Sequence, residues 1–256
     1  MIYAIADGRR ISPAKHATGT CPHCLRRVIA KCGNVKVAHW AHVGGENDCD
    51  PWAESETRWH RDWQLRADPS WCEVTMGENR EHRADIRRPR DGLVIELQHS
   101  YIGQEEVQER EDFYGNMFWV FDTTHWRFRL WLEADGSVHY RWMSRRHTLD
   151  AAKCPVFLDV GGPLLHVTGF GRQGCVSGTG SLLTRSAFIN MVGMRPLAQE
   201  ELLGTSHYTM DWGRGRTLLT TSLELLQEWR HESGLAMHHD LGGGTRIVEV
   251  PKRRSP

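Results

Sequence analysis

The sequence predicts a soluble α/β protein, and three observations lead to this prediction. Hydrophobic residues make up 39% and charged residues 25% of the 256 residues, the balance of an ordinary folded chain. No stretch approaches the roughly 18 uninterrupted apolar residues of a membrane-spanning helix. A strand, a helix and a second, continuously apolar strand follow one another over residues 93–121. That order is typical of a parallel crossover, and therefore of an α/β or α+β core.

The cysteine count and the first residues predict the compartment. Seven cysteines, an odd number, argue against a disulfide framework and favour a reducing environment. The opening run MIYAIADGRRISPAKH lacks the apolar segment of a secretory signal, so we expect a cytoplasmic protein without a membrane anchor. The 32 basic and 32 acidic residues balance, which excludes a globally basic nucleic-acid binder but leaves local basic patches open.

The first fifty residues form a region that is too poor in apolar residues to build a core alone, so it needs a metal or a larger neighbour. Cys21 and Cys24 form a CxxC pair, and His39 and His42 follow in the run HWAH. Two thiolates with one or two imidazoles complete the tetrahedral shell of a structural Zn²⁺ site, and Cys49 is a rival for the fourth position. The sequence therefore predicts zinc held by four of these five residues. The alternative is an unmetallated pair of cysteines beside surface histidines.

Basic residues surround the predicted zinc site. Arg26, Arg27, Lys31 and Lys36 lie between the CxxC pair and the histidines. They predict a surface that binds nucleic acid, because Lys and Arg neutralise phosphates. A solvated face without a partner is the alternative.

The next predicted region, residues 51–147, carries the strand–helix–strand core. We expect the following elements from apolar periodicity and turn residues: a helix over 53–66, a short strand over 72–76, two strands over 82–87 and 93–99 around the turn 89–92, a charged helix over 104–114, and a buried strand over 117–121. Gly115 and Asn116 are suitable residues to end the second helix.

The last predicted region, residues 148–256, has α+β character and an unassigned role. We expect a hairpin over 128–132 and 138–142 ahead of it, strands over 156–160 and 164–168, helices over 185–192 and 218–229, and a loose tail.

Two acids lie on the predicted hairpin of the core. In a strand, alternate side chains share a face, so Glu96 and Gln98 point to the same side. A two-residue loop centred on residues 91–92 would place Asp85 opposite Gln98 with Glu96 diagonal to it, and any loop of even length keeps the three on one face. Two neighbouring carboxylates are tolerated when a cation neutralises them, and hard oxygen ligands suit Mg²⁺ or Mn²⁺.

The preceding helix adds two candidates to this cluster. Glu56 and His60 are four residues apart, so they share one face of the helix and point to the same cluster. The alternative is that Asp85 and Glu96 are surface charges paired with neighbouring arginines, Arg83, Arg87 or Arg88.

The order of these motifs resembles a known family. The run CPHC…HWAH, then SETRWH, HRADI, IELQHS, the Arg110…Tyr114 pair and MFWVFD resembles the competence protein CoiA family over about residues 1–125. That family is a set of zinc-ribbon-bearing relatives of the PD-(D/E)XK nucleases. The resemblance implies a restriction-endonuclease-like mixed sheet flanked by helices, with an N-terminal zinc ribbon over residues 1–50.

The resemblance also implies roles for single residues. Asp85 and Glu96 would hold a catalytic Mg²⁺ or Mn²⁺, and Glu56 a second ion. Gln98 stands where many members of the superfamily carry Lys, and His60 would supply part of the missing positive charge. The later helix motif, Arg110 and Tyr114, would contact the DNA backbone; pairing of Arg110 with Glu106 or Glu111 is the alternative.

The predicted function is therefore metal-dependent hydrolysis of DNA phosphodiester bonds, in DNA uptake, recombination or defence. DNA is the expected partner, with no membrane, and with a second copy or a recombination protein as further candidates. A catalytically inactive DNA-binding accessory protein is the alternative. A zinc-binding HNH-type nuclease with His39 or His42 as base is another, although HWAH lacks the central Asn of that motif.

Overall fold

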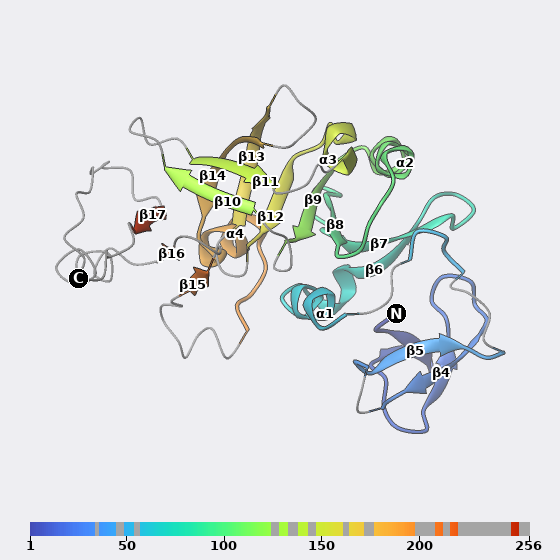
Figure 1. Cartoon of the computed structure of the whole chain (residues 1–256). Helices are drawn as coiled ribbons and strands as arrows, with labels where there is room; N and C mark the ends of the chain where they lie inside the picture. The colour runs from blue at the N-terminus through green and yellow to red at the C-terminus, as the bar shows by residue number, and fades with distance from the viewer. Residues whose placement is uncertain are drawn as a thin grey trace. The chain divides into compact units, whose positions relative to one another are not determined.

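The computed structural model describes residues 1–33, 36–44, 49–53, 57–123, 128–132, 138–142, 147–160, 164–171, 177–197, 208–211, 216–219 and 247–250. Two compact units make up the chain (Figure 1). Unit 1 comprises Met1–Ser100 and Asn116–Phe118, and unit 2 comprises Tyr101–Gly115 and Trp119–Pro256. The predicted boundaries after residues 50 and 147 stay predictions.

Unit 1 begins with a small antiparallel sheet in the order β2-β1-β3-β4-β5. Its strands are β1 (Ala4–Ala6), β2 (Arg9–Ile11), β3 (Thr18–Thr20), β4 (Arg27–Lys31) and β5 (His39–His42). The buried side chains beneath it are few, namely Met1, Ala4, Cys21, Val28 and Trp40. Because so little apolar surface is buried there, the sheet depends on further contacts for its stability, as the composition predicted.

The remainder of unit 1 contains one helix and three further strands that pair antiparallel. Helix α1 (Arg58–Gln64) starts later than predicted, because Thr57 caps it by accepting a hydrogen bond from the His60 backbone N–H at 3.1 Å. A short 3₁₀ turn, η1 (Pro69–Trp71), leads into the strands β6 (Cys72–Met76), β7 (His82–Arg87) and β8 (Val94–Gln98), which lie in that order. These strands match the predicted ranges closely.

The register of β7 on β8 differs from the prediction. Ile86 lies opposite Ile95, so continuing the register places Asp85 opposite Glu96 and not opposite Gln98. The connection is longer than two residues because the Arg88 side chain bonds Asp91 at 2.9 and 2.6 Å, which closes a wider loop. Because the wider loop still has an even number of residues, Asp85, Glu96 and Gln98 remain on one face of the two strands.

Six strands of a mixed sheet lie in the order β10-β11-β14-β13-β12-β9, and most of their residues belong to unit 2. Strands β9 (Met117–Asp122) and β12 (Val156–Asp159) pair in parallel, and the other neighbours are antiparallel. The other strands are β10 (Phe128–Leu132), β11 (Val138–Trp142), β13 (Leu164–Phe170) and β14 (Ser177–Leu183), and the helices are α2 (Gln104–Tyr114), α3 (His147–Ala151) and α4 (Arg185–Val192). A mixed α/β class is therefore confirmed, whereas the restriction-endonuclease-like arrangement stays a prediction.

The C-terminal strands correct one expectation. Strands β15 (Tyr208–Asp211), β16 (Arg216–Leu219) and β17 (Ile247–Val250) form a three-stranded antiparallel sheet. The first two residues of the helix predicted over 218–229 therefore belong to a strand, and the rest of that range lies outside the described residues. Among the described residues, no helix is both long and apolar enough to cross a membrane.

Candidate metal centre and carboxylate site

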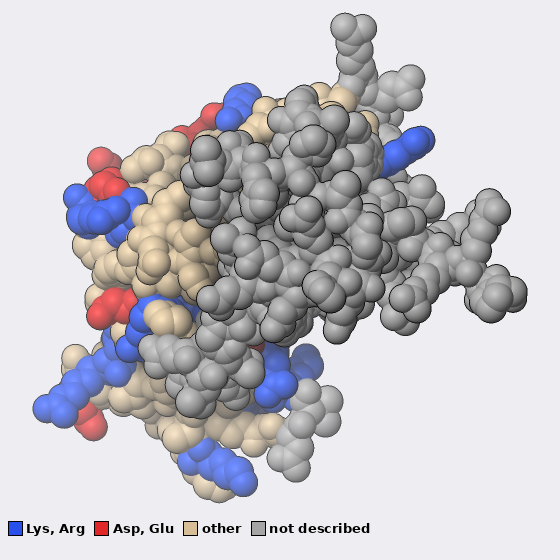
Figure 2. Space-filling view, turned by 90° about the vertical axis from the view of Figure 1, so that its left-hand side faces the viewer, with Lys and Arg blue, Asp and Glu red and all other residues tan. Residues whose placement is uncertain are grey.

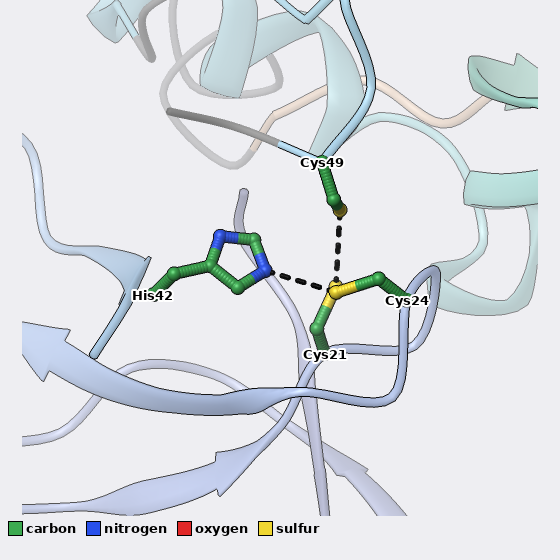
Figure 3. A group of neighbouring side chains, drawn as sticks. All are labelled: Cys21, Cys24, His42 and Cys49. Atoms are coloured by element: carbon green, nitrogen blue, oxygen red, sulfur yellow. Dashed lines mark hydrogen bonds between the residues drawn. The ribbon is translucent and has the colours of Figure 1, made fainter. Parts of the chain in front are cut away.

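Four of the five candidate zinc ligands come together in unit 1 (Figure 3). Cys21 and Cys24 belong to the turn between β3 and β4, His42 ends β5, and Cys49 follows seven residues later. The candidate ligand atoms of these side chains all lie within 4.8 Å of one another. The Cys21 and Cys49 sulfurs are 3.7 Å apart, and the Cys24 sulfur lies 3.2 Å from His42 Nε2.

The separation of the Cys21 and Cys49 sulfurs fits a tetrahedral zinc ion. With zinc–sulfur bonds of about 2.3 Å, two sulfurs of one tetrahedron are about 3.8 Å apart. The measured 3.7 Å between Cys21 and Cys49 agrees with that value. Three thiolates and one imidazole leave no coordination position for a substrate, so this group can hold a structural zinc ion.

The local backbone shapes this site. Leu25 has a left-handed backbone (φ +63°), which turns the chain directly after Cys24, and its N–H donates to the Cys21 carbonyl at 3.0 Å. The hydrogen bond with Cys49 lowers the pKa of the Cys21 thiol to about 4, with further lowering by backbone N–H groups and against the effect of burial. A lowered pKa favours the thiolate, which is the form of cysteine that binds metal.

The fifth candidate, His39, lies outside this group. Its Nδ1 is 2.8 Å from the Val37 carbonyl. Both histidines belong to β5, where residues three apart face opposite sides. His42 shares the face of the buried Trp40, and His39 points the other way.

Single substitutions distinguish the two histidines. We expect His42→Ala to lose most of its zinc and His39→Ala to keep about one zinc per chain, because only the first removes a ligand. Zinc content of the purified proteins, measured by metal analysis, checks this. Equal zinc loss in both variants would contradict the assignment.

The second site joins three elements of unit 1. The His60 Nε2 of α1 lies 2.9 Å from Asp85 Oδ1 of β7. Asp85 Oδ2 accepts the backbone N–H of Leu97 at 2.9 Å, and Glu96 Oε1 accepts the backbone N–H of Asp85 at 3.2 Å. The two carboxylates thus bind backbone groups across the β7–β8 pair.

The site is buried on one side and open at Asp85. Glu96 is 2% exposed and Gln98 is also buried, whereas the Asp85 side chain is 20% exposed. Gln98 donates its amide to the Ser100 carbonyl at 3.2 Å. His60 and Glu96 therefore both contact Asp85, with Gln98 on the same strand face as Glu96, and the catalytic roles of these residues stay predictions.

The remaining predicted residues are placed differently. Glu56 lies outside the described residues. Arg110 is 4% exposed, forms an ion pair with Glu106, and lies over the Trp119 ring at 5.9 Å. These contacts agree with the alternative in which Arg110 pairs with a glutamate of its own helix. Tyr114 is buried as well. The side chains of Arg110 and Tyr114 are thus both shielded from solvent. Contact of either residue with DNA stays a prediction.

Sequence reasoning missed Asp50, which follows Cys49 directly. This aspartate is 3% exposed, and its carboxylate accepts the backbone N–H of Arg83 at 2.7 Å and of Trp52 at 3.0 Å. The ring Nδ1 of His82 lies 3.0 Å from it. An acid adjoining a candidate zinc ligand was the one signal in the sequence.

The small antiparallel sheet, called the ribbon below, carries a closed Cys₃His group that could hold a structural zinc ion. Residues 9–50 match the family model described as the competence protein CoiA N-terminal domain, which confirms the CoiA-like resemblance in this segment. No curated protein and no solved structure matches the chain.

Proposed function

We propose that this protein is a metal-dependent DNA nuclease with a role related to competence. The proximity of Asp85, Glu96 and His60 is the observation that carries the proposal. The match of residues 9–50 to the CoiA N-terminal domain supports the biological setting.

The charge balance of the carboxylate site favours a bound cation. A buried carboxylate such as Glu96 costs free energy unless hydrogen bonds or positive charge compensate it. The Asp85 backbone N–H supplies part of that compensation for Glu96, and the Leu97 N–H and His60 supply it for Asp85. The donor set also fits the ion, because Mg²⁺ binds one or two carboxylates and keeps several waters. Asp85 and Glu96 would hold it.

Each residue has a defined part in the proposed reaction. The bound metal supplies an activated water and stabilises charge on the phosphate. His60 fixes the rotamer of Asp85 through their 2.9 Å contact. Gln98 carries no positive charge, so its contribution is limited to orienting groups by hydrogen bonds.

The N-terminal ribbon supports the DNA-binding part of the proposal. Figure 2 shows one face of the molecule, on which Lys and Arg side chains lie at several places of the described surface, in its upper as well as its lower part. Arg27, Lys31 and Lys36 are exposed on the ribbon. Such cations attract the phosphate backbone without reading its sequence.

The double variant Arg27→Ala/Lys31→Ala is expected to bind DNA more weakly. Each lost phosphate contact lowers the slope of log affinity against log salt by about 1. Affinity measured by fluorescence anisotropy at several salt concentrations checks this. Arg141→Ala, which removes an exposed arginine from β11 in unit 2, is the control expected to behave as wild type.

The proposed function is tested with the zinc-loaded wild-type protein and labelled single- and double-stranded DNA. We expect cleavage with Mg²⁺ or Mn²⁺ and none without added divalent metal. Salt-sensitive binding without cleavage under both metals would replace the proposal by the accessory-protein alternative. Absence of both binding and cleavage would contradict both functions.

A further inference from the structure

The segment carrying the last zinc ligand is fastened to strand β7. Asp50, next to Cys49, accepts the Arg83 backbone N–H at 2.7 Å and lies 3.0 Å from His82 Nδ1. Trp52 stacks flat on the His82 ring, with centroids 3.2 Å apart and an interplanar angle of 7°. A buried carboxylate with several donors holds its neighbours in one arrangement, because losing any partner leaves a desolvated charge.

The CxxC turn is fastened to the same hairpin independently. Arg80, in the turn between β6 and β7, donates its Nε to the His23 carbonyl at 2.8 Å and its Nη2 to the Pro22 carbonyl. Thr75 Oγ1 of β6 donates to the Pro22 carbonyl at 3.4 Å. The CxxC turn and the Cys49 segment, two of the three segments that carry candidate zinc ligands, therefore contact the β6–β7 hairpin.

That hairpin leads directly to the carboxylate site. Arg83 is two residues before Asp85 on β7. Beside them on β6, Glu73 has a left-handed backbone (φ +48°), which is costly for a residue other than glycine. Its carboxylate accepts the N–H groups of Ile2 and Tyr3 from the ribbon, both at 2.9 Å. The position of Asp85 thus depends on contacts that the ribbon supplies.

We propose that the zinc site braces strand β7, so that zinc binding and the placement of Asp85 are coupled. A zinc ion would fix Cys49 and the CxxC turn relative to each other. Asp50 and Arg80 connect these two segments to the β6–β7 hairpin by hydrogen bonds, so that the position of β7 depends on them. Coupling between two sites is reciprocal, so the hairpin residues Arg80 and His82 raise zinc affinity although neither is a ligand. This inference concerns the zinc and the strand, and its test does not use DNA cleavage.

The experiment compares full-length Arg80→Ala and His82→Ala with wild type and with Arg90→Ala. Arg90 is 66% exposed in the β7–β8 loop, and it serves as the matched control for Arg80. Zinc affinity is measured by competition with a chromogenic chelator. Backbone hydrogen exchange of residues 82–87 is measured in the zinc-loaded proteins, with residues 156–170 of unit 2 as the internal reference.

We expect zinc affinity at least about tenfold weaker in both variants, the range found when outer partners of metal ligands are removed. We also expect faster exchange over residues 82–87 and unchanged exchange over residues 156–170. Wild-type zinc affinity or wild-type exchange in both variants would overturn the proposal, as would an equal effect of Arg90→Ala. Because Arg80 is exposed, its replacement by Ala should leave folding intact, and a change in zinc affinity then does not come from a folding defect.

Discussion

Replacing Glu96 by Gln is expected to reduce DNA cleavage at least about a thousandfold, since about 4 kcal/mol of transition-state stabilisation by a metal corresponds to that factor. Gln removes the charge that would hold the ion. It keeps an oxygen that can accept the Asp85 N–H, now 3.2 Å from Glu96 Oε1. The fold should therefore survive, with zinc content and melting temperature close to wild type. Initial cleavage rates with Mg²⁺ and with Mn²⁺ measure the effect.

The control for Glu96→Gln is Glu78→Gln, which removes an exposed acid from the β6–β7 turn. Its cleavage rate should equal that of wild type. Glu96→Gln with wild-type cleavage would remove Glu96 from the proposed reaction. Equal loss of activity in both variants would point to a general charge effect.

Replacing Cys49 by Ser is expected to weaken zinc binding by more than about 100-fold, beyond the 10- to 100-fold losses typical of partners outside the ligand shell. Cys49 contributes one of the three sulfurs, and its sulfur lies 3.7 Å from that of Cys21. Because the ribbon buries few apolar side chains, losing the metal should also lower its thermal stability. Chelator competition and calorimetry at equal protein concentration measure the two effects.

The control for Cys49→Ser is Cys32→Ser, a half-buried cysteine just after β4 that lies outside the four-ligand group. It should keep zinc affinity and melting temperature unchanged. Equal zinc loss in the two variants would contradict the ligand set. Unchanged zinc affinity in Cys49→Ser would leave His39 to be tested as the fourth ligand.

Several elements could be predicted because their signals are local. Helix α4 spans the predicted range of residues 185–192, since Thr184 caps its first turn and Gly193 takes the left-handed backbone (φ +79°) that ends it. Helix α2 ends at Gly115 for a comparable reason, with a positive φ of +66°. The CxxC pair likewise predicted metal binding from neighbouring residues alone.

The zinc ligand set needed long-range information. The choice between His39 and His42 depends on how far strand β5 extends and which face carries Trp40, since residues three apart on a strand point to opposite sides. Cys49 joins the site through the path of the chain after β5, which no spacing rule fixes. Asp50 escaped notice because its partners are some thirty residues away.

The sequence by itself predicted most of the element types, the CoiA-like Cys/His cluster and a shared face for Asp85 and Glu96, because strand alternation survives any connection of even length. Only the tertiary structure decided the register, in which Ile86 lies opposite Ile95, since the Arg88–Asp91 pair widens the loop. It also buried Arg110 beside Glu106, because the packing of α2 against its neighbours, and not the residue type, decides which cations reach solvent.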